Sequence, residues 1–198
     1  MQIDFSPVEI GEVTLYEFAQ RFSVDDLRSA TNSSLNTILE ILGDADDAQL
    51  TFIPDDPLAD DPIAPPEERY QGWNLAHLVA HVTATSEEWA TYSGILARGI
   101  VYPREPRLRR ETDWHTLKTR DQVIARIAES RRMRLAALES WPNTPYLDVF
   151  RDMSENFIAK RGPVNAKSAF LFGYRHEQGH LEQFREAARQ AREAIKAR

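Results

Sequence analysis

The chain has 198 residues, no cysteine and a formal net charge of −7. This length suits one domain with a buried core. The acidic balance argues against a nucleic-acid binder, which carries a concentrated basic face. Without cysteine there is no disulfide, thiolate metal ligand or cysteine nucleophile, so any metal site must use nitrogen and oxygen ligands. We therefore expect a small-molecule substrate and no nucleic-acid partner.

The sequence shows no signal for export or membrane insertion. The opening residues, MQIDFSPVEIGEV, lack the basic start and apolar run of a signal peptide. No apolar run approaches the roughly 20 residues that a membrane-spanning helix needs. We expect a cytoplasmic protein without a membrane partner.

Capping residues and apolar spacing predict four long helices, after a short helical start at Thr14. Ser23 can cap the first, and Gly43 can end it. Thr119 and Gln122 form the capping box of the third. The four helices are expected over residues 23–42, 74–98 and 119–141, and from 165 almost to the C-terminus.

The connections between these helices are long, and no run alternates as a strand would. Residues 44–72 form an acidic, proline-rich loop, and residues 142–164 an irregular connector. Neither side of the acidic loop holds enough apolar residues to fold alone. We expect a single domain over residues 1–198, of the all-α class, built as a four-helix bundle with long crossover loops.

Four of the five histidines form two pairs with a spacing of four residues, His77 with His81 and His176 with His180. Side chains four apart share one face of a helix, and the second pair interrupts an apolar stripe that should face the core. Buried imidazoles need hydrogen-bond partners or a metal. We predict a divalent transition metal, zinc, nickel or iron, against the alternative of core histidines with hydrogen-bond partners. His115 is expected on the surface.

Residues 176–180 also match the H-E-x-x-H signature of metalloproteases, in which Glu177 would be the general base. The extended form of that signature fails, because Phe184 stands where a glycine is required. No predicted strand precedes the motif to hold a peptide. A metallohydrolase is therefore the less favoured alternative.

Two segments resemble the DinB/YfiT-like superfamily. Trp73 precedes His81 by eight residues, and Gln183 follows a pair of histidines three residues after His180. The resemblance implies a four-helix bundle in which His81, His176 and His180 hold the metal. His77 is not one of the implied ligands. It is expected to contact a ligand histidine without binding the metal, or to pack in the core. Members of this superfamily include transferases and isomerases that use a low-molecular-weight thiol.

Three imidazoles would leave a coordination position open for water or substrate, as in catalytic sites. Glu88, on the face of His81, and Glu177 are acid or base candidates, with a surface role as the alternative for each. Gln183 is a candidate for orienting a ligand, or an ordinary surface glutamine. We expect a metal-dependent transferase or isomerase; the alternative is a stress-associated metal-binding bundle without catalysis.

The connector before the third helix is basic. We expect it to be solvated or to contact another subunit; the alternative is that its arginines meet the carboxylates of a thiol cofactor. Bundles of this kind often pair through a helix face, so a homodimer is expected. The arginines are Arg104, Arg107, Arg109 and Arg110.

Overall fold

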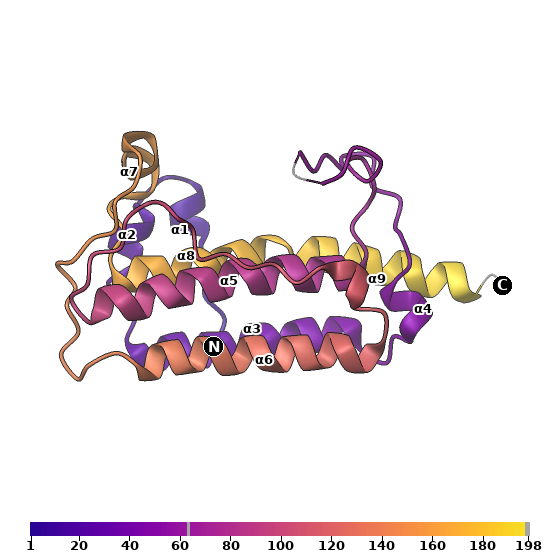
Figure 1. Cartoon of the computed structure of the whole chain (residues 1–198), viewed down its shortest axis with the longest axis horizontal. Coiled ribbons are helices and arrows are strands. Elements are labelled where there is room, and N and C mark those ends of the chain that lie inside the picture. The colour runs from indigo at the N-terminus through magenta and orange to yellow at the C-terminus, as the bar shows by residue number, and fades with distance from the viewer. Residues whose placement is uncertain (63, 197–198) are drawn as a thin grey trace.

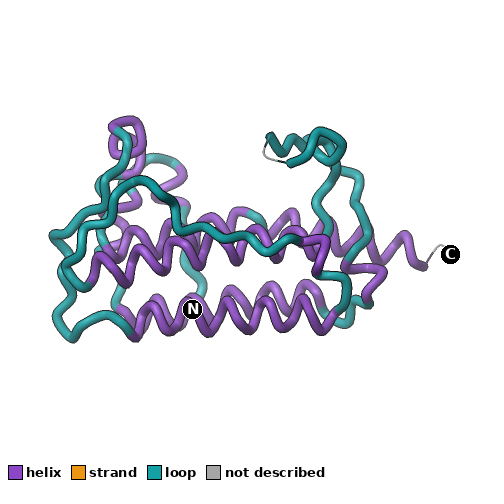
Figure 2. Tube along the Cα trace, viewed as in Figure 1, coloured by secondary structure: helices purple, strands orange, loops and turns teal. Residues whose placement is uncertain are grey.

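A computed structural model of the chain describes residues 1–62 and 64–196, which form helices and loops with no named strand (Figures 1 and 2). The predicted all-α bundle is confirmed. Its long helices are α3 (Val24–Leu42), α5 (Leu75–Ala97), α6 (Arg120–Glu139), and α8 (Ala166–Gly179) continued by α9 (Leu181–Lys196). The short ones are α1 (Ser6–Glu9), α2 (Leu15–Ala19), α4 (Asp47–Leu50), η1 (Trp114–Thr116) and α7 (Glu155–Arg161).

The predicted caps begin the helices. Ser23 and Thr119 each accept a hydrogen bond from the backbone N–H three residues later, closing the capping boxes of α3 and α6. Asn74 accepts the backbone N–H of His77 at 2.8 Å and begins α5. The start of α5 fixes which face of the helix carries its histidines.

The fourth predicted helix is interrupted once. α8 ends at Gly179, and His180 separates it from α9, although the two helices continue in the same direction (Figure 1). The backbone N–H of His180 bonds to the carbonyl of Glu177, three residues back, so the last turn of α8 tightens. The N–H of Phe184 bonds to the His180 carbonyl at 3.0 Å and starts α9.

The bundle core consists of two apolar clusters with polar side chains between them. One cluster joins the C-terminal half of α5 to α1, α2 and α8. The other joins the N-terminal half of α5 to α3, α4 and α9. Each of the helices α3, α5, α6 and α8 has buried polar residues between the two clusters. This middle layer contains Thr31, Ser34, Thr83, Ser86, Glu87, Ser130, Arg134 and Glu177.

The connector between α5 and α6 folds back along α5 (Figure 1). Arg107 donates to the buried Glu88 at 2.9 Å, and the backbone N–H of Leu108 donates to the Tyr92 hydroxyl at 2.8 Å. The connector is therefore fastened to α5 at these points, while Arg104, Arg107 and Arg110 remain exposed, as expected for a solvated stretch. Among the described residues, no helix is both long and apolar enough to cross a bilayer.

Candidate metal centre

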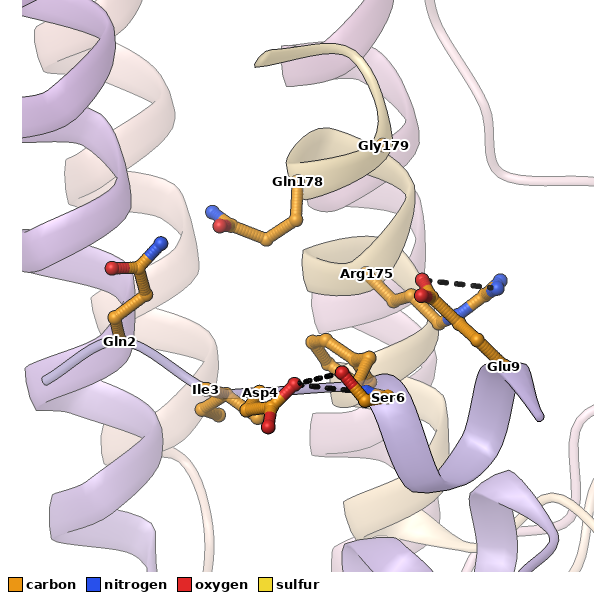
Figure 3. A pocket seen from close by; sticks show the side chains of 9 residues that line it. Gln2, Ile3, Asp4, Ser6, Glu9, Arg175, Gln178 and Gly179 are labelled. Carbon is orange, nitrogen blue, oxygen red and sulfur yellow. Dashed lines mark hydrogen bonds and ion pairs between the residues drawn. The ribbon is translucent and has the colours of Figure 1, made fainter. Parts of the chain in front are cut away.

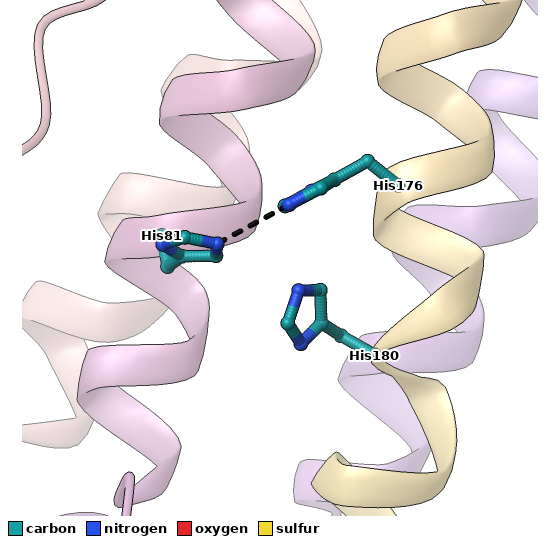
Figure 4. Close-up of side chains that lie close together, drawn as sticks. All are labelled: His81, His176 and His180. Atoms are coloured by element: carbon teal, nitrogen blue, oxygen red, sulfur yellow. Dashed lines mark hydrogen bonds between the residues drawn. The ribbon is translucent and has the colours of Figure 1, made fainter. Parts of the chain in front are cut away.

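Three histidines converge in the middle of the bundle (Figure 4). His81 comes from α5, His176 from the last turn of α8, and His180 from the junction between α8 and α9. One ring nitrogen of each lies within 4.8 Å of the others, and the Nε2 atoms of His81 and His176 are 3.2 Å apart. The structure brings together the three ligands that the resemblance implied.

A glycine allows α5 and α8 to approach closely at this level. Gly173 lies one turn before His176, and a Cβ atom there would be 3.0 Å from the Cα of Ser86 and 2.9 Å from the Cβ of Trp89. Contacts this short do not occur between real side chains without a shift of backbone, so glycine sets the helix separation. That separation brings His176 to His81.

The histidines fit a divalent ion in spacing and in protonation. Zinc–imidazole bonds of about 2.0–2.1 Å place tetrahedral ligand nitrogens roughly 3.3 Å apart, close to the 3.2 Å between His81 and His176. Burial lowers the pKa of His176 to about 3 and also lowers that of His180. Both rings are therefore neutral near pH 7, the form that binds metals. The Nδ1 atom of His180 lies 2.9 Å from the Gln183 Oε1 atom; as donor in this bond it leaves Nε2 free for a metal.

Glu111 and Arg109 lie beside the outer nitrogen of His81. Glu111 was missed in the sequence, and Arg109 was named there only as a connector arginine. A carboxylate oxygen of Glu111 is 3.6 Å from His81 Nδ1, and a guanidinium nitrogen of Arg109 is 3.2 Å from the same atom. Burial would raise the pKa of Glu111, but hydrogen bonds from His81 and Arg109 outweigh it and lower this pKa to about 2. Nδ1 of His81 thus lies between a guanidinium, which can only donate, and a carboxylate, which can only accept, and these two groups hold the ring in place.

The two predicted acid–base glutamates lie elsewhere. Glu177 is 0% exposed, accepts from Arg134 at 2.8 Å, and is also hydrogen-bonded by Ser34. Glu88 is buried and accepts from Arg107 and Tyr92. These hydrogen bonds join each glutamate to neighbouring segments of the bundle. The surface role is wrong for both, because both are buried, and neither carboxylate belongs to the histidine cluster. A catalytic role for either glutamate stays a prediction.

His77 is buried in an aromatic stack and is not part of the histidine cluster. Its ring lies 4.4 Å from the ring of Trp73 and 5.0 Å from that of Trp114, centre to centre, and is nearly parallel to the latter. Trp73 also packs against His81 and His180, at 4.6 and 5.9 Å. His77 thus packs behind the tryptophan that borders the cluster.

A cavity of about 690 Å³ opens beside His81 and His176. Another, of about 400 Å³, lies between the N-terminal segment and α8 (Figure 3). Its charged groups are already engaged, Arg175 with Glu9 at 3.8 Å and Asp4 with the Ser6 hydroxyl at 2.6 Å. Of these two cavities, the one at the histidines combines space for a ligand with side chains that could bind a metal.

The family model of the DinB superfamily matches residues 30–184 of the chain. The chain belongs to the DinB superfamily. The matched range contains all three clustered histidines, Gln183 and most of the bundle. No curated protein and no solved structure matches the chain at a significant level.

As a DinB-superfamily bundle, the chain carries a histidine triad that could hold one metal ion. Three imidazole ligands leave a coordination position for a further ligand. The cavity beside His81 and His176 gives such a ligand access from outside. A metal held here would therefore keep an open position, unlike the closed coordination of a structural zinc site.

Proposed function

We propose that this protein is a metal-dependent transferase or isomerase that acts with a low-molecular-weight thiol. The convergence of His81, His176 and His180 beside an open cavity is the observation that carries the proposal. A divalent ion held by these residues would lower the pKa of a thiol bound beside it, so that a thiolate nucleophile is present near pH 7.

The surrounding residues support this chemistry by orienting and shielding the ligands. Gln183 lies at hydrogen-bond distance from the outer nitrogen of His180, and Arg109 and Glu111 lie beside the outer nitrogen of His81, so both rings are held in place. Trp73 covers the rings of His81 and His180 on one side and limits the access of water there. In a transfer reaction, the thiol sulfur bonds to an electrophilic carbon, the leaving group departs with its electron pair, and the thiol proton passes to solvent.

The test uses the cobalt(II)-substituted protein titrated with 2-mercaptoethanol. We expect a sulfur-to-cobalt absorption band, and conjugation of the thiol to a chromogenic aryl halide that His81→Ala abolishes. Glu139→Gln, an exposed change at the end of α6 and away from the cavity, is the control and should leave both readouts unchanged. A protein that binds cobalt without any thiol-dependent spectrum or turnover would instead be the non-catalytic metal binder.

A further inference from the structure

Arg151 is a buried cation in the wall of the cavity beside the histidines. The residue is only 6% exposed, yet no carboxylate among the described residues forms an ion pair with it. Its guanidinium donates to the Arg104 carbonyl at 2.9 Å and lies 3.7 Å from the centre of the Tyr92 ring. The buried Nε–H has no partner at all.

A buried charge of this kind calls for an anion. Removing a guanidinium from water is costly, and aromatic faces return only part of that cost. Of the connector arginines in this wall, Arg107 pairs with Glu88 and Arg109 with Glu111, whereas Arg104 is exposed to solvent. Arg151 is therefore the buried arginine of this wall whose charge is left for a ligand.

The surfaces beside Arg151 are apolar. Trp89 and Phe172 line the cavity with their rings 4.3 Å apart, and Met153 completes this part of the wall. Trp89 follows His81 by eight residues on α5, which places it about 12 Å farther along the helix axis. A ligand held at Arg151 would therefore lay an apolar body over Trp89 and extend toward His81.

We propose that this cavity binds an organic carboxylate, with its carboxyl group on Arg151 and its apolar part on Trp89 and Phe172. A monoanion suits the charge of this cavity, whose wall has four arginines against three carboxylates: Arg104, Arg107, Arg109 and Arg151, with Asp61, Glu105 and Glu111. The proposal rests on the proposed function for its catalytic meaning, but the binding itself needs only Arg151 and the apolar wall.

The carboxylate can belong to either of two ligands, the thiol or the molecule that the thiol attacks. Two pairs of probes distinguish them. The first pair is 3-phenylpropionate and its neutral analogue 3-phenylpropan-1-ol, and the second is 3-mercaptopropionate and 3-mercaptopropan-1-ol. The first pair stands for the molecule that the thiol attacks, and the second pair stands for the thiol. The carboxylate belongs to the ligand whose pair shows the greater preference for the acid over the alcohol.

Calorimetric titration of the zinc-loaded full chain tests the proposal. We expect at least one acid to bind roughly tenfold more tightly than its alcohol, a preference that Arg151→Gln removes and Arg151→Lys retains in part. Arg110→Gln, an exposed change on the connector, should leave the preference intact. Equal affinities of acid and alcohol in the unaltered protein would overturn the proposal, as would an acid preference that survives in a folded Arg151→Gln variant.

A further variant separates this result from the metal chemistry. In His180→Ala, which removes a triad ligand, the preference for the acid should persist, because it depends on Arg151. If it disappears there while the fold is intact, the acid binds the metal and the assignment to Arg151 is wrong. If zinc binding fails in the unaltered protein but the preference remains, the proposed function falls and the carboxylate site stands.

Discussion

The Nε2 atoms of His81 and His176 lie 3.2 Å apart, although 95 positions separate the two residues in the chain. Two neutral imidazoles at this distance can share one proton or bind one cation between them. The third ring, of His180, and the open cavity make the cation the simpler explanation. The predictions below test how the surrounding residues maintain this geometry.

Gln183 should tune metal affinity without belonging to the ligand set. Its carbonyl oxygen lies 2.9 Å from His180 Nδ1, so Gln183→Leu frees that ring to rotate. We expect a loss of roughly ten- to a hundredfold in zinc affinity, measured by competition with a chromophoric chelator. Gln190→Leu, on the same helix but bonded to Asp55, is the matched control. Equal affinities in the two variants would contradict this role.

Gly173 should set the distance between α5 and α8. In Gly173→Ala the new methyl group meets the backbone of Ser86, so the helices must separate. We expect the free energy of unfolding to fall by about 1–3 kcal/mol and zinc affinity to fall with it.

The matched control is Gly179→Ala, where a Cβ atom meets nothing within 4 Å. Alanine should there leave zinc affinity unchanged and stabilise the helix by up to about 1 kcal/mol. Urea denaturation of both variants measures the free energy of unfolding, and chelator competition measures zinc affinity. Full zinc affinity in Gly173→Ala would show that the helix separation does not control the site.

Glu177 should matter for stability and not for metal binding. Glu177→Gln leaves Arg134, which is 1% exposed, without its counter-ion. Breaking a buried ion pair in this way typically costs about 3–5 kcal/mol, whereas replacing both partners by apolar residues restores much of that loss. We expect Glu177→Gln to be destabilised in urea, the Arg134→Leu/Glu177→Leu double variant to recover, and both to retain zinc. A stable Glu177→Gln protein that hydrolyses no peptide while the unaltered protein does would revive the metalloprotease interpretation.

His77 should make the metal-free protein less stable in mild acid. Burial lowers its pKa from 6.5 to about 4, so between these values the unfolded chain binds a proton that the folded chain does not. The stabilisation is complete above pH 6.5 and is lost as the pH falls toward 4, by at most about 3 kcal/mol. His77→Phe, which keeps a ring between Trp73 and Trp114, should show a shallower decline in urea midpoints measured with a chelator present. Parallel pH curves would show that His77 does not carry this dependence.

The helices and the triad were predictable because their signals are local. The capping boxes at Ser23 and Thr119 lie within three residues, and a spacing of four places His176 and His180 on one face. The break at His180 was not predicted, since one tightened turn leaves the apolar periodicity unchanged.

The residues around the triad could not be read from spacing, because they depend on how distant segments pack. Glu111 and Arg109 reach His81 only because the connector folds back along α5. Glu177 adjoins His176 in sequence, but the helix turns its carboxylate toward Arg134 on α6. Sequence adjacency therefore suggested a catalytic pair where the structure has a buried ion pair.

Elemental analysis of the untagged protein, as purified and after reloading with zinc, nickel or iron, tests the central claim most directly. The samples are the unaltered chain, His81→Ala, His180→Ala and, as the control, His77→Phe. We predict about one metal equivalent in the unaltered chain and in His77→Phe, with loss in the two alanine variants. No metal after reloading, or equal metal in all four proteins, would contradict a metal centre formed by His81, His176 and His180.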